Sequence, residues 1–328
     1  MTSLMTNTWT CSLVTLRLTV YPSPCASLNH PIMNILSSLW PWPWWGVMVF
    51  VNLCSTIVCI KFFRESSKAP DSQTHYVRSM RFMGLAFTLV AMYRSVFVSR
   101  YLYQYGWFDT IANSSLIIRS FAWIAELSFV GLIAFAMLRF NKDVPHNNHG
   151  NSTLLSQYER HAPWALIMCI FLAQFFATGG LITKSRLLFA IEETLWGVGF
   201  LSILPLAIIQ LRRAFPSGRT SKQSGLGMLR VFSVVNVGWC LIYCTYALVY
   251  HLPTEYWETA LAQLETGIPP IKSDISAVID AFHIVNVTHR YADWGFGFVL
   301  WHSAYFSICV WLALFLMRAP RYRPFSPD

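Results

Sequence analysis

Charged residues are scarce in this chain of 328 residues. Asp, Glu, Lys and Arg make up 12% of the sequence, whereas ordinary soluble domains contain about 25% charged residues. Hydrophobic residues make up 55%, and the mean hydropathy is +0.45. A soluble globular protein is therefore excluded, and the composition predicts an integral membrane protein of the plasma membrane or of an endomembrane.

The excess of positive charge forms no long basic run. The formal net charge is +9, but Lys and Arg are spread over the segments between apolar stretches. Clustered basic residues are typical of nucleic-acid binding, whereas basic residues beside apolar spans are typical of proteins in a bilayer. We therefore expect a lipid bilayer, and no nucleic acid, as partner.

Motifs for metals, haem and disulfides are missing as well. The eight cysteines include no CxxC pair, and six of them fall within apolar stretches, where Cys packs as a small apolar side chain. His302 is the only histidine well inside such a stretch, so neither paired-histidine haem ligation nor a HxxxH metal site can form there. We expect no metal site, and no motif identifies another cofactor.

What the sequence does have is seven long apolar stretches. Each is long enough to cross roughly 30 Å of hydrocarbon as a helix that rises about 1.5 Å per residue. They lie at about 40–60, 80–99, 113–137, 163–183, 187–211, 227–250 and 295–317. We predict an all-α protein with a seven-helix transmembrane domain at 39–318, which includes a long outer loop at 251–294, and a tail at 319–328.

The Lys and Arg residues beside these stretches predict the orientation, because basic residues are retained on the cytoplasmic side. Fourteen of them lie in one set of segments and five in the other set. The first set consists of residues 61–79, 138–162, 212–226 and the tail. We therefore predict an outside N-terminus, a cytoplasmic C-terminus and an outside position for the loop 251–294.

Residues 1–38 differ in composition from the rest of the chain. They are rich in Ser, Thr, Leu and Pro, and they contain Arg17 but no acidic residue. A transit peptide would contain more arginines, and a cleavable signal would have a longer apolar centre. We interpret this segment as a disordered or non-native leader, with a targeting signal as the alternative.

The long loop 251–294 contains six acidic residues and two basic ones. Two stretches in it are typical of short helices, "TEYWETALAQLE" and "SDISAVIDAFHIVN", and glycine and proline separate them. The second has an apolar stripe that predicts a face against protein or bilayer. The residues of this stripe are Ile275, Val278, Ile279, Phe282 and Val285. An acidic cap over the bundle is favoured over a solvated linker, because the stripe must be buried against something.

Two stretches match the acceptor motif for N-glycosylation. Asn286-Val-Thr288 lies on the predicted outer side, whereas Asn151-Ser-Thr153 lies on the predicted inner side. We therefore expect glycosylation at Asn286 and no modification at Asn151.

Six ionisable residues lie well inside the predicted spans, away from their ends. They are Arg94, Arg119, Glu126, Glu192, Glu193 and His302. Glu126 is near mid-membrane, and the other five lie in the outer half of the predicted domain. Asn52, Gln174 and Asn236 add neutral polar groups at about the central level. An unpaired charge in hydrocarbon costs at least about 3 kcal/mol, so each ionisable group must find partners or water.

The pair Arg119 and Glu126 lies within one predicted helix, in the stretch "RSFAWIAE". Seven residues turn a helix through about 700°, so both side chains leave one face, but they are about 10.5 Å apart along the axis. We therefore expect no easy direct salt bridge between them. The expected partners of Arg119 and Arg94 are Glu192 or Glu193. Those of Glu126 are His302 or Tyr305.

These residues allow a structural and a functional interpretation. Salt bridges between helices would fix the packing, whereas a polar pocket open to the outside would bind an ion, a proton or a small molecule. The pocket is favoured, and a transporter or channel is the first hypothesis, although no internal repeat is visible. The alternatives are a lipid-modifying enzyme with Glu126, Glu193 and His302 as acid and base, and a receptor or structural membrane protein.

The sequence lacks the motifs of three known families of seven-span proteins. A D/E-R-Y motif should end the third span of a G-protein-coupled receptor, and an NPxxY motif the seventh, but the chain reads "FAMLRFNKD" and "SICVWLALFLM" there. A rhodopsin needs a lysine in the last span, and residues 295–317 contain none. The metal-binding histidines of alkaline ceramidases are also missing from "GFGFVLWHSAYF".

Overall fold

The computed structural model describes residues 40–65, 71–145, 153–215 and 226–322. These residues are almost entirely helical, so the prediction of an all-α protein is confirmed. The predicted leader 1–38, the acceptor residue Asn151 and the end of the tail lie outside the described residues.

Six described helices are long and apolar enough to cross a membrane. Four are single α-helices: α2 (Pro41–Arg64), α4 (Ser115–Asp143), α5 (Thr153–Thr183) and α6 (Arg186–Ala214). The other two are composite and contain π-helical turns. The first consists of α7 (Gly227–Tyr246), η4 (Ala247–Trp257) and α8 (Glu258–Thr266). The second consists of α10 (Tyr291–Ala304), η5 (Tyr305–Cys309) and α11 (Val310–Met317). The chain is thus a multi-pass integral membrane protein.

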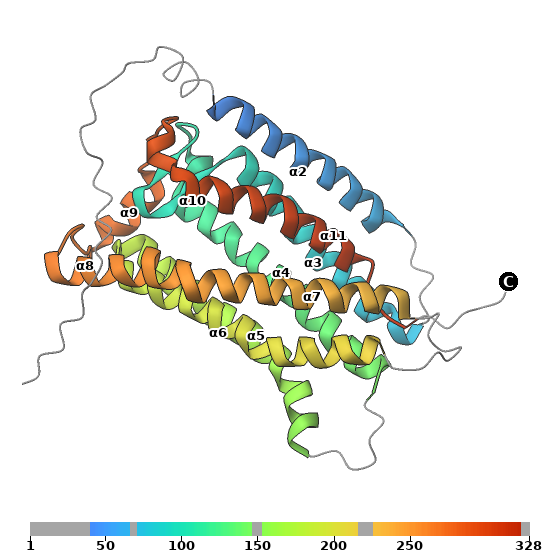
Figure 1. Cartoon of the computed structure of the whole chain (residues 1–328). Coiled ribbons are helices and arrows are strands. Elements are labelled where there is room, and N and C mark those ends of the chain that lie inside the picture. The colour runs from blue at the N-terminus through green and yellow to red at the C-terminus, as the bar shows by residue number, and fades with distance from the viewer. Residues whose placement is uncertain (1–39, 66–70, 146–152, 216–225, 323–328) are drawn as a thin grey trace, which may run out of the picture.

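The predicted span 80–99 corresponds to α3 (Asp71–Val96), which at 26 residues is longer than α2 but less apolar than the six candidate spans. Its composition differs because Arg81 and Arg94 lie at the two ends of its apolar part. In the bundle, α3 packs against α2, α4 and α11 (Figure 1). Helices that are neighbours in sequence are therefore neighbours in space, and α11 returns to the side of α2 and α3.

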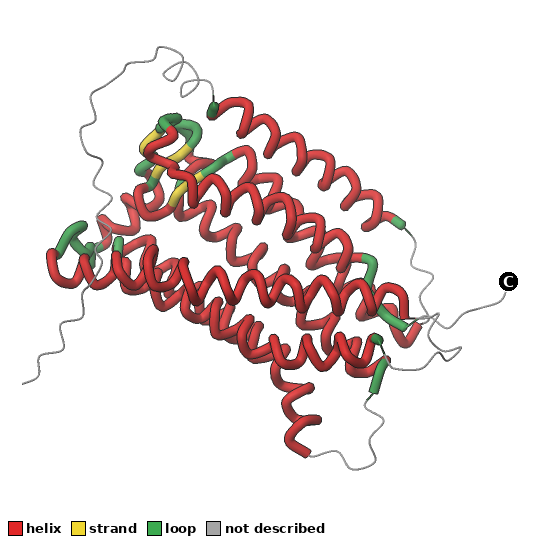
Figure 2. The backbone as a smooth tube through the Cα atoms, viewed as in Figure 1, coloured by secondary structure: helices red, strands yellow, loops and turns green. Residues whose placement is uncertain are grey.

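The two ends of the bundle differ in structure (Figure 2). At one end lie a three-stranded sheet, two short 3-10 helices, α8 and α9. The strands are β1 (Ser99–Arg100), β2 (Tyr105–Gly106) and β3 (Asn286–Val287). The 3-10 helices are η1 (Tyr101–Tyr103) and η2 (Ile111–Asn113), and the α-helix α9 spans Ile275–His283. β2 pairs with β1 antiparallel and with β3 parallel. We call this end, residues 97–114, 184–185 and 258–290, the capped end.

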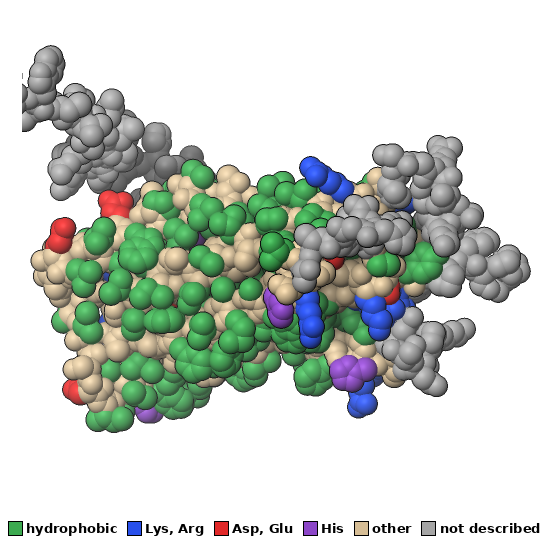
Figure 3. Space-filling model, turned by 90° about the horizontal axis from the view of Figure 1, so that it is seen from below, with side chains coloured by type: hydrophobic (Ala, Val, Ile, Leu, Met, Phe, Trp, Pro, Cys, Tyr) green, Lys and Arg blue, Asp and Glu red, His purple; other side chains and the backbone are tan. Residues whose placement is uncertain are grey.

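The opposite end is where α2, α4, α6 and α11 finish, and we call it the basic end. Its helix ends carry Lys61, Arg64, Lys142, Arg212 and Arg213. Figure 3 shows hydrophobic side chains over the middle of the molecule, acidic ones mainly at the capped end, and Lys and Arg mainly towards the basic end. This distribution is typical of a protein whose middle is surrounded by lipid.

Close helix packing predicts a defined mutational effect at Gly84. A Cβ atom added there would overlap the side chain of Met317, so Gly84→Val will force α3 away from α11. Overpacking of this kind costs about 1–3 kcal/mol. Gly238→Val is the matched control, because nothing lies within 4 Å of a Cβ atom on that helical glycine. We expect thermal unfolding of the purified protein to show a lower Tm for the first variant than for the second; equal Tm values would contradict the packing of α3.

Candidate functional site

Arg119 on α4 is the centre of a buried network that joins three helices. Its Nη1 lies 3.3 Å from the Glu126 carboxylate on the same helix, and its Nη2 lies 3.3 Å from the Glu192 carboxylate on α6. The same Nη2 donates a 2.6 Å hydrogen bond to the amide oxygen of Gln174 on α5. The amide nitrogen of Gln174 in turn donates to Glu126 at 2.9 Å. Two carboxylates and one amide therefore surround this guanidinium, as an ion buried to 2% exposure requires.

The direct pair of Arg119 and Glu126 corrects the sequence interpretation. The expectation that they are too far apart for a salt bridge is wrong, because both side chains extend along the helix axis and together bridge about 10.5 Å. His302 or Tyr305 was the expected partner of Glu126, and this expectation is also wrong. Glu126 bonds instead to Arg119 and Gln174. The expected pairing of Arg119 with one of the two neighbouring glutamates of α6 is found with Glu192.

Arg94 on α3 has a looser environment than Arg119. Its Nη1 lies 4.0 Å from the Glu126 carboxylate, beyond hydrogen-bond distance, and this nitrogen donates no hydrogen bond to the described residues. The guanidinium carbon lies 5.0 Å from the Phe306 ring and 5.6 Å from the Tyr101 ring, which are cation–π distances. Arg94 is thus buried and charged, but its donors are only partly used.

Three further side chains near Arg94 have polar atoms without hydrogen-bond partners among the described residues. These atoms are both ring nitrogens of His302, the hydroxyl of Tyr305 and the hydroxyl of Tyr101. His302 and Tyr305 interact electrostatically with Arg94, and the His302 ring packs 4.4 Å from Phe306. We call Arg94, Tyr101, His302 and Tyr305 the Arg94 cluster. Buried polar atoms in proteins nearly always have a partner. Other buried polar atoms of the described residues also lack one, but this set contains a guanidinium nitrogen, an imidazole and two phenol hydroxyls.

Glu193 belongs to a second cluster, nearer the capped end. Its carboxylate lies 3.8 Å from Nε2 of His251, and Nδ1 of His251 lies 2.6 Å from Glu255 and 3.0 Å from the Tyr246 hydroxyl. The two glutamates of α6 therefore point to different partners, as neighbours on a helix must. His251 is not among the predicted site residues, although the i,i+4 spacing of His251 and Glu255 is a signal for such a pair.

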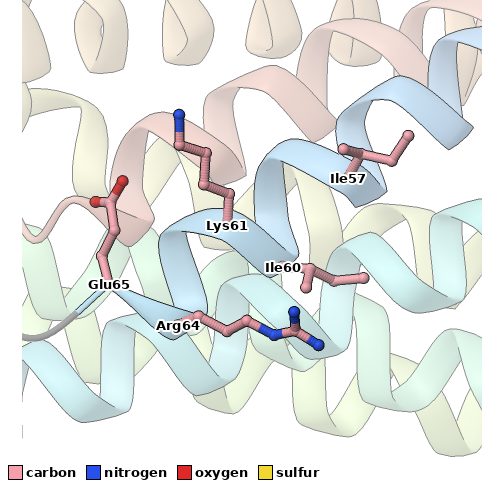
Figure 4. A pocket seen from close by; sticks show the side chains of 5 residues that line it. All are labelled: Ile57, Ile60, Lys61, Arg64 and Glu65. Carbon is pink, nitrogen blue, oxygen red and sulfur yellow. The ribbon is translucent and has the colours of Figure 1, made fainter.

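The two surface hollows described for this structure lie at the basic end. One, of about 490 Å³, is lined by Ile57, Ile60, Lys61, Arg64 and Glu65 at the end of α2 (Figure 4). The other, of about 750 Å³, lies between α2, α3 and α4. Neither contains a predicted site residue. In this conformation the Arg94 cluster is enclosed by its neighbours.

The three groups that an enzyme mechanism would combine are not together. Glu126 is bonded to Arg119, Glu193 faces His251, and His302 packs among aromatic rings. The described residues also contain no group of three His, Cys, Asp or Glu side chains that could hold a metal ion. We compared the chain with protein-family models, characterised proteins and solved structures, and none of the three comparisons found a match.

The network predicts that Gln174 is a key neutral residue. Gln174→Leu keeps the volume but removes one hydrogen bond from Arg119 and one from Glu126, which costs about 1–3 kcal/mol. Thr178→Val on the same helix is the control, since it removes one neutral hydrogen bond, from Trp123. We expect thermal unfolding to show the larger drop in Tm for Gln174→Leu. A drop no larger than that of the control would mean that Gln174 does not hold the ion pair.

Proposed function

We propose that the chain is a seven-span membrane protein, with α3 as the seventh span. In support, α3 is 26 residues long and packs against three helices, each of which is long and apolar enough to cross a bilayer or is part of such a span. Its Arg94 is buried, so that charge does not face lipid. The positive-inside rule then puts the basic end in the cytoplasm and the capped end outside. In this orientation Asn286, which is exposed on β3, is the acceptor for N-glycosylation.

This orientation predicts the labelling of single cysteines. In a chain without its native cysteines, Thr266→Cys at the capped end and Lys142→Cys at the basic end place a thiol on an exposed residue. We expect an impermeant maleimide to label the first in intact cells and the second only after permeabilisation. The opposite result would reverse the orientation, and labelling of both in intact cells would contradict the three spans that begin with α5, α6 and α7 and separate these two positions.

The Arg94 cluster is the basis of the functional proposal. We propose that it binds a small carboxylate within the bundle, as a step in its passage through the membrane. The observation that carries this proposal is the meeting of Arg94 Nη1, two tyrosine hydroxyls and an imidazole, all buried and all without hydrogen-bond partners among the described residues. A guanidinium fork and phenol hydroxyls are the donors that a carboxylate prefers.

The charges around Arg94 support an anion rather than a cation. Arg119 is matched closely by two carboxylates, whereas Arg94 has only the 4.0 Å contact to Glu126. His302 adds a group that can accept or donate a proton, so a carboxylic acid can be held with its proton.

Tyr305 lies in the π-helical turn η5, and His251 lies in the π-helical segment η4. Such turns occur frequently at functional sites, where they interrupt a regular helix.

The proposal predicts that carboxylates stabilise the protein through Arg94. We expect lactate and succinate to raise the Tm of the purified protein, because a ligand at 100 times its Kd adds about 2.7 kcal/mol to stability. Arg94→Gln should abolish this increase. Arg139→Gln should retain it, since Arg139 is a partly buried arginine that pairs with Asp143 at the basic end. If neither carboxylate raises the Tm of the unsubstituted protein, the network is structural and the binding proposal is wrong.

Flux distinguishes transport from the other functions of such a site. In proteoliposomes, a transporter will take up radiolabelled lactate, and uptake will be lost in Arg94→Gln but kept in Arg139→Gln. Binding of lactate without uptake would instead favour a receptor. Turnover of an added lipid without either would favour an enzyme.

A further inference from the structure

Helix α9 lies across the end of the bundle rather than along it. Just before α9, the backbone N–H of Lys272 donates a 2.8 Å hydrogen bond to the carbonyl of Thr183, the last residue of α5. Towards its other end, the Ala281 carbonyl accepts a hydrogen bond from the Ser114 hydroxyl, at the first turn of α4. The helix therefore bridges the ends of α5 and α4, at the level where these helices leave the apolar layer.

Three faces can be distinguished on α9, because successive residues are about 100° apart. Ala277 and Ala281, each 1% exposed, form the face that packs against α4 and α5. Ile275 and Ile279 point elsewhere and remain 75% and 52% exposed. The third face carries polar residues. These are Ser276, Asp280 and His283.

The exposed isoleucines decide between two expectations for the apolar stripe. The sequence predicts that this stripe rests on protein or on bilayer, and the alanine face has taken the contact with protein. The chain before α9 continues the exposed apolar surface with Ile268 and Ile271. α5, on which α9 packs, exposes Phe175 towards the surroundings of the bundle. α9 thus packs on a helix whose own exposed surface is apolar at this residue.

We propose that α9 is an interfacial helix, which lies in the boundary between lipid and water at the capped end. Ile275 and Ile279 are in the acyl-chain region, and the face with Ser276 and Asp280 is towards water. Helices that lie in this boundary run parallel to the membrane plane. They have an apolar face towards the lipid and a polar face towards water. The ion pair of Asp280 with Lys272 lies on the polar side, where headgroups and water can solvate it.

Spin labels on the two faces test this arrangement. In a chain without its native cysteines, Ile279→Cys and Ser276→Cys are labelled with a nitroxide and reconstituted in phosphatidylcholine vesicles. Collisions with oxygen, which concentrates in lipid, are compared by EPR with collisions with a water-soluble nickel chelate. We expect oxygen to dominate at residue 279 and the nickel chelate at residue 276. Equal access of the nickel chelate to both positions would overturn the proposal.

A second variant separates lipid contact from contact with another protein. With the label moved to Ile275→Cys, Ile279→Asp should shift the label towards the nickel chelate, whereas Ser276→Asp should not. The Tm of each variant shows whether the bundle is intact. Protection of residue 279 from both reagents, or dipolar broadening between labels, would mean that a second copy of the chain covers the face, and this too would overturn the proposal.

Discussion

The cost of a charge in hydrocarbon is the constraint on which this structure depends. An arginine at the centre of a spanning helix costs about 2.5–3.5 kcal/mol by insertion scales, so Arg119 can be buried only with partners. Those partners are Glu192 on α6, Gln174 on α5 and Glu126 on α4 itself. Because each must reach one guanidinium, the ion network fixes the relative positions of three helices.

The same constraint explains why polar contacts recur where helices meet. In lipid, the hydrophobic effect gives helices little reason to associate, since the acyl chains are as apolar as leucine. Close packing and interhelical hydrogen bonds replace it. Asn52 on α2 donates to the Phe306 carbonyl in η5, and Gln210 on α6 donates to the Met137 carbonyl on α4. Each bond joins a helix to another far from it in sequence.

The sequence predicts the helices well and their pairing poorly, for physical reasons. Hydropathy identifies the segments that must avoid water, so six spans follow from composition, and α3 is ambiguous only because Arg81 and Arg94 offset its apolar residues. The same measure identifies the buried charges but not their partners. Arg119 reaches Glu126 through side-chain length and Glu192 through the register of α4 and α6, neither of which hydropathy contains.

The contrast between the two buried arginines favours a functional role for one of them. Both are enclosed at one end of the bundle, and each leaves one buried nitrogen without a hydrogen bond among the described residues, Nε of Arg119 and Nη1 of Arg94. Arg119 nevertheless pairs with two carboxylates at 3.3 Å, whereas the Glu126 carboxylate lies 4.0 Å from Nη1 of Arg94. A purely structural network would gain stability by pairing both, because unsatisfied buried donors cost about 1–3 kcal/mol each. Stability is given up in proteins where function requires it, and such local inconsistencies mark functional sites. The unsatisfied atoms of His302 and Tyr305 lie near Arg94, and Tyr101 lies between Arg94 and Arg119, so a solute with complementary polar groups would recover the lost bonds there.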